Sequence, residues 1–188
     1  MNKKVIEVEN DHIYQWDNYF RTSMDPNSRC IWVTEIDDDA HTDILKAVKF
    51  LESVSMEPIT VYVDSYGGSM YEALAIYDVL TTSPCTIKTI GVGKVMSAGV
   101  IVLLSGSIVE AYRNTTFMLH EVAAQSGGKT SEIENELKET KRLQEILLDI
   151  LNSVNQKGKD WWNRKIKSID VYFTTEEALS IGIIDGVI

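Results

Sequence analysis

The chain has 188 residues, 44% of them hydrophobic, which is enough for one domain with a substantial core, so we expect a single domain over residues 1–188. The formal net charge of −10 excludes nucleic acid as the main partner, because binding to phosphates requires a basic surface. One short basic segment, KGKDWWNRKIK (157–167), is interpreted as a surface helix with Trp161 or Trp162 turned inward.

The cysteines and the apolar runs exclude several further classes. Cys30 and Cys85 stand far apart without CxxC spacing, and the three histidines are scattered, so we expect no disulfide framework and no metal site. The N-terminus lacks the apolar core of a secretory signal. The longest uncharged apolar run, 95–104, is too short to cross a bilayer. These features predict a cytoplasmic protein that makes no membrane contact.

The segment from residue 30 to residue 65 alternates strand and helix patterns. The letters CIWVTEI (30–36) are typical of a short strand. Apolar residues then recur on one face of a predicted helix: Ile44, Ala47, Val48 and Leu51. The letters ITVYVDS (59–65) are rich in β-branched residues and predict a buried strand.

The next unit begins with the pair Gly67 and Gly68. A predicted helix follows, with Ser69 in position to cap it and with apolar residues at helical spacing: Met70, Ala73, Leu74, Tyr77 and Leu80. A second buried strand is predicted at CTIKTIGVG (85–93), and a helix is predicted after Met96. Two more short strands are predicted, at GSIVEAYR (106–113) and TTFMLH (115–120).

A long helix is predicted from about Ser131 to Val154, opened by a capping box of Ser131 and Glu134. Its apolar stripe comprises Ile133, Leu137, Leu143, Ile146, Leu147, Ile150 and Leu151. A helix of this length with such a stripe often packs on a partner as well as on its own core. The tail has a second capping box, Thr174 and Glu177, then a short helix and a last strand at 183–188. The alternation predicts an α/β fold with a mostly parallel sheet.

Two junctions between a strand and a helix are candidate sites, because ligands of parallel α/β sheets bind where strand ends meet helix N-termini. At DSYGGS (64–69), glycine N–H groups can approach a ligand closely, although a tight turn alone also explains the two glycines. At GKVMSAG (93–99), Ser97 lies at a helix N-terminus, where a capping role is the simplest explanation of a serine.

If Ser97 is a nucleophile, it needs a base, and His120 at the end of TTFMLH is the best candidate. An isolated histidine after an apolar run is also commonly structural. A third group must orient the imidazole, and three carboxylates lie at the ends of predicted elements: Asp64, Glu121 and Asp170. Composition and spacing do not choose among them.

Four segments, in chain order, resemble the ClpP family of Clp protease proteolytic subunits, serine peptidases of the ClpP/crotonase superfamily. They are YVDSYGGSMYEALAIYDVL (62–80), GKVMSAGVIVLLSG (93–106), NTTFMLHE (114–121) and DVYFTTEEALSIGIIDGVI (170–188). The resemblance implies an α/β fold of repeated β-β-α units with a long protruding handle helix (131–154). It also implies that Ser97 is the nucleophile and His120 the base, and it selects Asp170 as the orienting carboxylate.

The mechanism that the resemblance implies is peptide hydrolysis by acyl transfer to Ser97. The backbone N–H groups of Gly68 and Ala98 would form the oxyanion hole, and Gly67, Gly68 and Glu121 would contact substrate. The strand TTFMLH would accept a peptide as an added strand. No cofactor is expected in this subunit, because ATP would be used by a separate AAA+ unfoldase.

The resemblance further implies a homo-oligomer of two stacked seven-membered rings that encloses unfolded polypeptides. The chain departs from the family pattern at Tyr66 (proline in the family), at Ala98 (methionine) and at 121–122 (Gln-Pro). Residues 1–30 do not follow the family pattern, so the resemblance does not establish how an unfoldase would dock. In this divergence the chain is similar to the ClpP-like proteins that some bacteriophages encode. Two alternatives remain: a crotonase-type acyl-CoA enzyme, and a catalytically silent subunit that serves as a scaffold.

Overall fold

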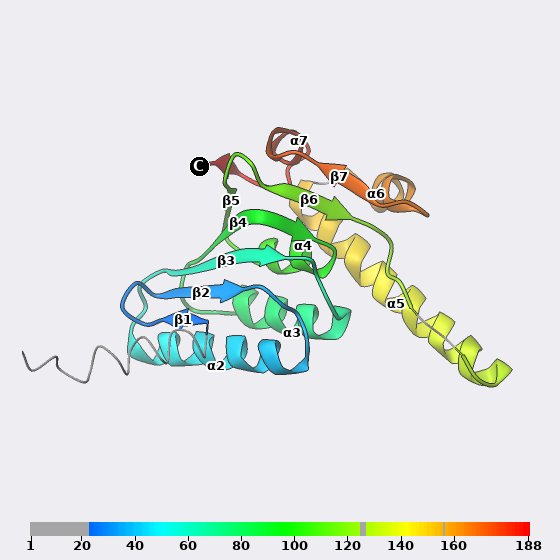
Figure 1. The fold of residues 1–188 in the computed structure, drawn as a ribbon, viewed down its shortest axis with the longest axis horizontal. Helices are drawn as coiled ribbons and strands as arrows, with labels where there is room; N and C mark the ends of the chain where they lie inside the picture. Colours follow the sequence, from blue (N-terminus) through cyan, green and yellow to red (C-terminus); the bar gives the residue numbers. More distant parts are fainter. Residues whose placement is uncertain (1–22, 125–126, 156) are drawn as a thin grey trace, which may run out of the picture.

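The computed structural model describes residues 23–124, 127–155 and 157–188. Six strands lie side by side in the order β1 (Met24–Asp25), β2 (Cys30–Val33), β3 (Ile59–Ser65), β4 (Ile87–Met96), β5 (Ile108–Ala111) and β8 (Gly186–Val187) (Figure 1). Off this path, β6 (Thr116–Leu119) pairs with β4, and β7 (Val171–Phe173) pairs with β6. Among the strand pairs of the described residues, only β1–β2 and β6–β7 are antiparallel. The predicted α/β fold with a mostly parallel sheet is therefore confirmed.

Strand β4 pairs with two different strands on the edge that faces away from β3. Its first part, 88–91, pairs with β5, and its last part, 94–96, pairs with β6. The end of β4, which leads directly to Ser97, therefore lies beside β6, which leads directly to His120.

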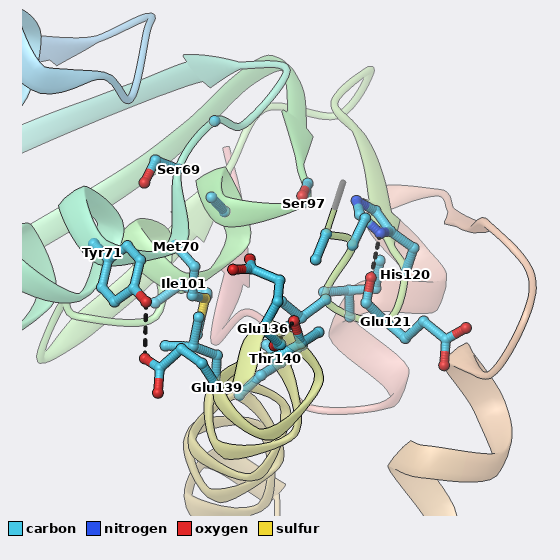
Figure 2. A pocket seen from close by; sticks show the side chains of 18 residues that line it. Ser69, Met70, Tyr71, Ser97, Ile101, His120, Glu121, Glu136, Glu139 and Thr140 are labelled. Carbon is cyan, nitrogen blue, oxygen red and sulfur yellow. Dashed lines mark hydrogen bonds between the residues drawn. The ribbon is translucent and has the colours of Figure 1, made fainter. Parts of the chain in front are cut away.

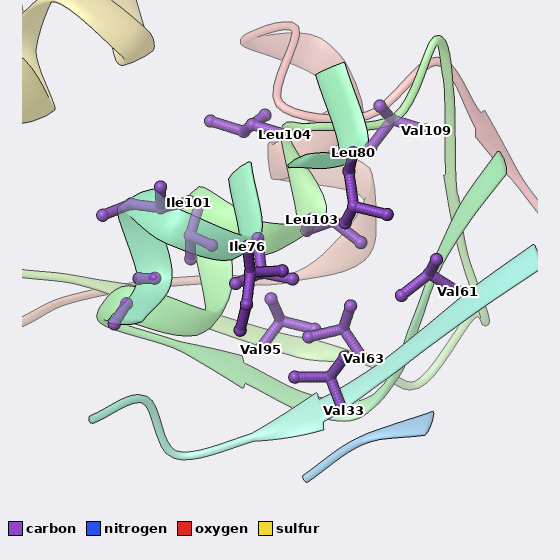
Figure 3. Packing of buried hydrophobic residues seen from close by; sticks show 14 of the residues in the cluster. Val33, Val61, Val63, Ile76, Leu80, Val95, Ile101, Leu103, Leu104 and Val109 are labelled. Atoms are coloured by element: carbon purple, nitrogen blue, oxygen red, sulfur yellow. The ribbon is translucent and has the colours of Figure 1, made fainter. Parts of the chain in front are cut away.

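Three helices cover one face of the sheet: α2 (Asp38–Val54), α3 (Met70–Thr81) and α4 (Ala98–Leu103) (Figure 1). Helix α3 packs between α2 and α4. Figure 3 shows Ile76 and Leu80 of α3 and Leu103 of α4 packed over valines of the sheet: Val33, Val61, Val63 and Val95. All six residues of α4 are buried, so the segment that follows Ser97 is anchored in the core.

Helix α5 (Thr130–Asn155) has two different halves. Its buried residues all lie in the second half: Leu143, Leu147, Leu148, Ile150 and Leu151. In the first half, Ile133 and Leu137 are 40% and 53% exposed, and the helix extends beyond the body of the domain (Figure 1). The predicted box of Ser131 and Glu134 is wrong, because Ser131 lies inside the helix and Glu132 accepts the Lys129 N–H (2.9 Å).

The last elements are α6 (Lys159–Ile166) and α7 (Thr175–Ser180). In α6, Trp162 is completely buried, as predicted for one of the two tryptophans, and its indole N–H donates to Asn155 (3.2 Å). The predicted capping box of Thr174 and Glu177 is present at the start of α7.

Several boundaries differ from the sequence predictions. The strand predicted over 30–36 ends at Val33, and Ile36 forms only an isolated bridge with Gly68. Strand β6 is paired on both edges, by β4 and β7, so the predicted addition of a peptide to this strand is wrong. The prediction about residues 1–30 lies outside the described residues except for 23–30, which include β1. Within the described ranges, no helix is both long enough and apolar enough to cross a membrane.

Candidate active site

Ser97 occupies a strained turn between β4 and α4, with φ 52° and ψ −123°. Residues other than glycine seldom adopt a positive φ, and strain of this kind is concentrated at functional sites. The turn is held by a hydrogen bond from the Ser97 N–H to the Met118 carbonyl (2.8 Å). Ser97 takes the N-cap position of α4, but in the described part of the chain its side chain makes no capping hydrogen bond. Capping therefore does not account for this hydroxyl.

The pair of glycines packs directly against the Ser97 turn. A Cβ atom on Gly67 (φ 104°) would lie 2.8 Å from both the Ser97 Cβ and the Met96 carbonyl oxygen, and one on Gly68 would overlap the Ile36 carbonyl. Only glycine allows this approach. Gly68 lines the same cavity as Ser97 and Ala98. Because Ala98 is the first residue of α4, its N–H has no partner within the helix.

His120 follows the last residue of β6 and lines the same cavity as Ser97. Its Nδ1 lies 2.6 Å from the Glu121 carbonyl oxygen. A carbonyl can only accept, so this contact requires a proton on Nδ1. In the neutral imidazole with this tautomer the lone pair is on Nε2, the arrangement that a general base needs. Across the described ranges, no hydrogen bond joins His120 to Ser97 or to Asp170.

The pairing of β6 with β7 brings Asp170 near His120. Leu119 pairs with Val171 as the last pair of this antiparallel ladder, and His120 and Asp170 are the residues that directly adjoin that pair, one on each chain segment. Residues directly opposite each other in such a ladder have Cβ atoms about 4.5–5.5 Å apart. Asp170 is exposed and does not line the cavity.

The two rival carboxylates are engaged elsewhere. Asp64 forms an ion pair with Lys94 (Oδ1–Nζ 2.7 Å). Glu121 lines the cavity, but its Oε1 accepts the Ser168 N–H (3.3 Å). Of the three candidates, Asp170 is therefore the one that the strand register brings to His120.

The cavity next to Ser97 has a volume of about 350 Å³. It lies between the Ser97 turn, the segment after β6 and helix α5 (Figure 2). Its apolar lining includes Met70, Ile101, Leu119, Leu143 and Leu147. Leu143 and Leu147 therefore face the domain's own cavity, and only the first half of the predicted stripe of α5 remains free to meet a partner.

Acidic side chains dominate the charge of this cavity. Glu121, Glu136 and Glu139 line it, whereas no lysine or arginine among the described residues does. Arg142 donates two hydrogen bonds to Glu139, and the Tyr71 hydroxyl donates a third (2.8 Å). These bonds, with Arg142 the larger influence, lower the pKa of Glu139 from 4.5 to about 2. The same bond to Glu139 raises the pKa of Tyr71, so its hydroxyl keeps its proton.

One group of side chains has the composition of a metal site. Ligand atoms of Asp38, His41 and Glu72 lie within 4.8 Å of one another. None of these residues lines the cavity beside Ser97. The scattered histidines gave no sign of this group, because its members come from two helices, α2 and α3. We assign the group no part in the site.

Comparison with known proteins decides the family. The sequence model of the Clp protease family matches residues 15–188. The chain belongs to the Clp protease family. An ATP-dependent Clp protease proteolytic subunit of Deinococcus radiodurans is 31% identical over 188 residues, which cover 98% of this chain and 90% of that protein. Proteolytic subunit 2 of Frankia casuarinae is 33% identical over 174 residues, which cover 88% of this chain and 80% of that protein.

A solved structure agrees with this assignment. The structure of a ClpP1 variant from Listeria monocytogenes superposes with a TM-score of 0.80 at 27% sequence identity, covering 87% of this chain and 92% of that one. The predicted ClpP-like fold and the predicted function as a Clp-type serine protease subunit are confirmed at the level of the family. The roles of individual residues stay predictions.

The residues of α5 and α3 that line the cavity were not predicted from the sequence as site residues. Helical spacing places four of them on one face of α5: Glu136, Thr140, Leu143 and Leu147. The position of the apolar stripe could therefore have indicated that Glu136 faces the same cavity. No comparable pattern pointed to Tyr71, which comes from a different helix.

Proposed function

We propose that this member of the Clp protease family hydrolyses peptide bonds of unfolded polypeptides through an acyl-enzyme on Ser97. The observation that carries the proposal is the cavity shared by Ser97, His120, Gly68 and Ala98. It combines a hydroxyl in a strained turn, a histidine whose Nδ1 donates to a backbone carbonyl, and backbone N–H groups next to the hydroxyl.

In the proposed reaction, His120 Nε2 takes the proton of Ser97 Oγ as that oxygen attacks the peptide carbonyl carbon. The N–H groups of Gly68 and Ala98 donate to the resulting oxyanion, and each such donor contributes about 10²–10³ in rate. The C–N bond then breaks, and His120 passes its proton to the leaving amine. A water molecule, deprotonated by His120, releases the acyl group from Ser97.

Asp170 enters this proposal as the group that stabilises the imidazolium. The Nδ1 proton now points to the Glu121 carbonyl. A turn of the His120 ring toward Asp170, the residue just before β7, would transfer this bond to the Asp170 carboxylate, whose negative charge stabilises the protonated ring better than a carbonyl does. Catalytic hydrogen bonds often tighten only when substrate is bound, which is consistent with the open arrangement of these three residues.

We extend the proposal to the assembly. Ile133 and Leu137, exposed on the projecting half of α5, support a homo-oligomer joined through this helix, and two stacked seven-membered rings are the arrangement that the resemblance to the family implies. The relatives are named as proteolytic subunits of an ATP-dependent protease, which supports a separate AAA+ unfoldase that uses the ATP. In this proposal the peptidase subunit itself needs no cofactor. The two free cysteines, Cys30 and Cys85, support a cytoplasmic location.

Degradation of casein, an unfolded protein, and hydrolysis of an acyl-CoA thioester test this function against its alternatives. We expect the assembled wild type to cleave casein, Ser97→Ala to be inactive, and Ser69→Ala to remain active. Ser69 is a matched control, because it also lines the cavity and its side chain caps nothing. Activity on the thioester alone would indicate a crotonase-type enzyme. Activity on neither substrate in an assembled sample would indicate a silent scaffold.

A further inference from the structure

Helix α5 contributes one acidic wall to the cavity beside Ser97. Glu136 and Glu139 lie one turn apart and line the cavity together with Thr140, Leu143 and Leu147 of the same helix. Figure 2 shows the Glu136 side chain projecting from α5 into the region between Tyr71 and Ser97. A side chain that enters the cavity beside Ser97 therefore meets both an apolar lining and carboxylates from α5.

The two carboxylates of α5 differ in their partners. Glu139 is already neutralised by Arg142 and held by the Tyr71 hydroxyl. The Glu136 carboxylate has no hydrogen bond or ion pair with any residue that the structure describes, and only its backbone carbonyl is bonded, by Thr140. Glu136 is therefore the acidic group of this wall that is available to a ligand.

The rest of the cavity also suits a cation. The ring of Tyr71, whose side chain is 53% exposed, lines it, and aromatic faces attract ammonium and guanidinium groups. No basic side chain of the described residues lines the cavity, and the nearby charge of Arg142 is paired with Glu139. The aliphatic stem of a lysine or arginine can pack on Met70 and Ile101 while its charged end reaches the acidic wall.

We propose that Glu136 makes this cavity a specificity pocket for lysine or arginine at the residue whose carbonyl Ser97 attacks. That residue is the one whose side chain starts closest to Ser97 and can enter the cavity. The inference rests on the proposed function, since it assigns substrate preference to the same site.

Peptides that differ only at this residue test the proposal in the full-length, assembled protein. The residue is lysine, norleucine, which has the same stem without the charge, or glutamate. We expect kcat/KM for the lysine peptide to exceed that for norleucine by about fivefold, the effect of one solvated ion pair, and the glutamate peptide to be the poorest. In Glu136→Gln the lysine preference should disappear while norleucine is cleaved as before. Glu134→Gln, which removes an exposed carboxylate of α5 outside the cavity, should match the wild type.

A second measurement separates failure of this inference from failure of the proposed function. Binding of the same peptides, labelled with fluorescein, is measured by anisotropy in Ser97→Ala and in Ser97→Ala with Glu136→Gln. We expect the lysine peptide to bind about fivefold more tightly than norleucine only when Glu136 is present, and less so at high salt. Equal lysine preference with and without Glu136, or no preference, overturns the inference even if all peptides are cleaved. Charge-selective binding without any cleavage would uphold the pocket and overturn the proposed function.

Discussion

His120 and Asp170 both directly adjoin the last pair of the β6–β7 ladder, Leu119 with Val171. The Ser97 N–H is bonded to Met118 in the same strand β6. Three segments that are distant in the chain therefore meet at the end of β6, where each supplies one member of the proposed triad.

This arrangement predicts that Asp170→Asn lowers kcat by about 10⁴-fold with little change in KM, because an amide cannot stabilise the imidazolium and favours the wrong tautomer. The measurement is steady-state hydrolysis of a fluorogenic peptide. Asp64→Asn and Glu121→Gln are the matched controls, since they remove the two rival carboxylates; both should retain most of kcat, and any effect of Glu121→Gln, which lines the cavity, should fall on KM. A comparable loss in either control, or none in Asp170→Asn, would show that another group orients His120.

Gly67 predicts a second effect on the same turn. A methyl group there would meet the Ser97 Cβ and the Met96 carbonyl, each 2.8 Å away. We expect Gly67→Ala to displace the oxyanion donors and to lower kcat/KM by about 10²–10³-fold. Gly158→Ala is the control, because Gly158 also has a positive φ (96°) but a Cβ atom there would meet nothing within 4 Å. It should cost stability, measured as Tm, and leave kcat/KM unchanged.

The two halves of α5 predict opposite results for a new charge. Leu137→Glu should separate stacked rings, seen as a smaller particle in sedimentation velocity, while the subunit stays folded by circular dichroism, because Leu137 is 53% exposed. Leu143→Glu should unfold the subunit itself, since Leu143 is 6% exposed and a buried unpaired charge is very costly. Asn135→Glu adds the same charge at an exposed polar position of α5 and should change neither property. An unchanged particle for Leu137→Glu would rule out the proposed role of α5.

Glu139 predicts a pH effect on stability. Its pKa is about 2 in the folded chain, below the ordinary value of 4.5, because Arg142 and Tyr71 donate hydrogen bonds to the carboxylate. Because the pKa of Glu139 is lower in the folded chain than in the unfolded chain, its carboxylate stabilises the fold at pH values above the ordinary pKa. This contribution is lost as the pH falls from about 4.5 toward 2. The wild type should therefore have a higher Tm than Glu139→Gln at neutral pH, and the difference should vanish across this window. A difference in Tm between the two proteins that does not change with pH would contradict the lowered pKa of Glu139.

The sequence predicted the elements well where a local pattern decides them. The strand 59–65 and the capping box of Thr174 and Glu177 have the predicted positions, because β-branched alternation and capping depend on neighbours in the chain. The apolar stripe of α5 did not show which of its residues are buried. One continuous apolar pattern runs from the projecting half of the helix, where it is exposed, into the half that packs on the domain. Helix periodicity describes which residues share a face, not what that face meets.

The candidate site was predictable only in part, for a related reason. Ser97 and His120 lie at element ends that the sequence marks, but choosing Asp170 without a resemblance requires the register between β6 and β7. The acidic wall depends on how α5 packs against α3, and no pattern in the sequence encodes the contact of Tyr71 with Glu139.

Labelling with a fluorophosphonate probe, with the modified residue mapped by peptide mass spectrometry, tests the proposed triad most directly. The probe reacts covalently with an activated serine and needs neither a partner unfoldase nor a known substrate. We predict a single adduct on Ser97 in the wild type, and a much slower reaction in His120→Ala and Asp170→Ala. An adduct on another serine, or no adduct in an assembled and folded sample, would contradict the assignment of Ser97 as the nucleophile.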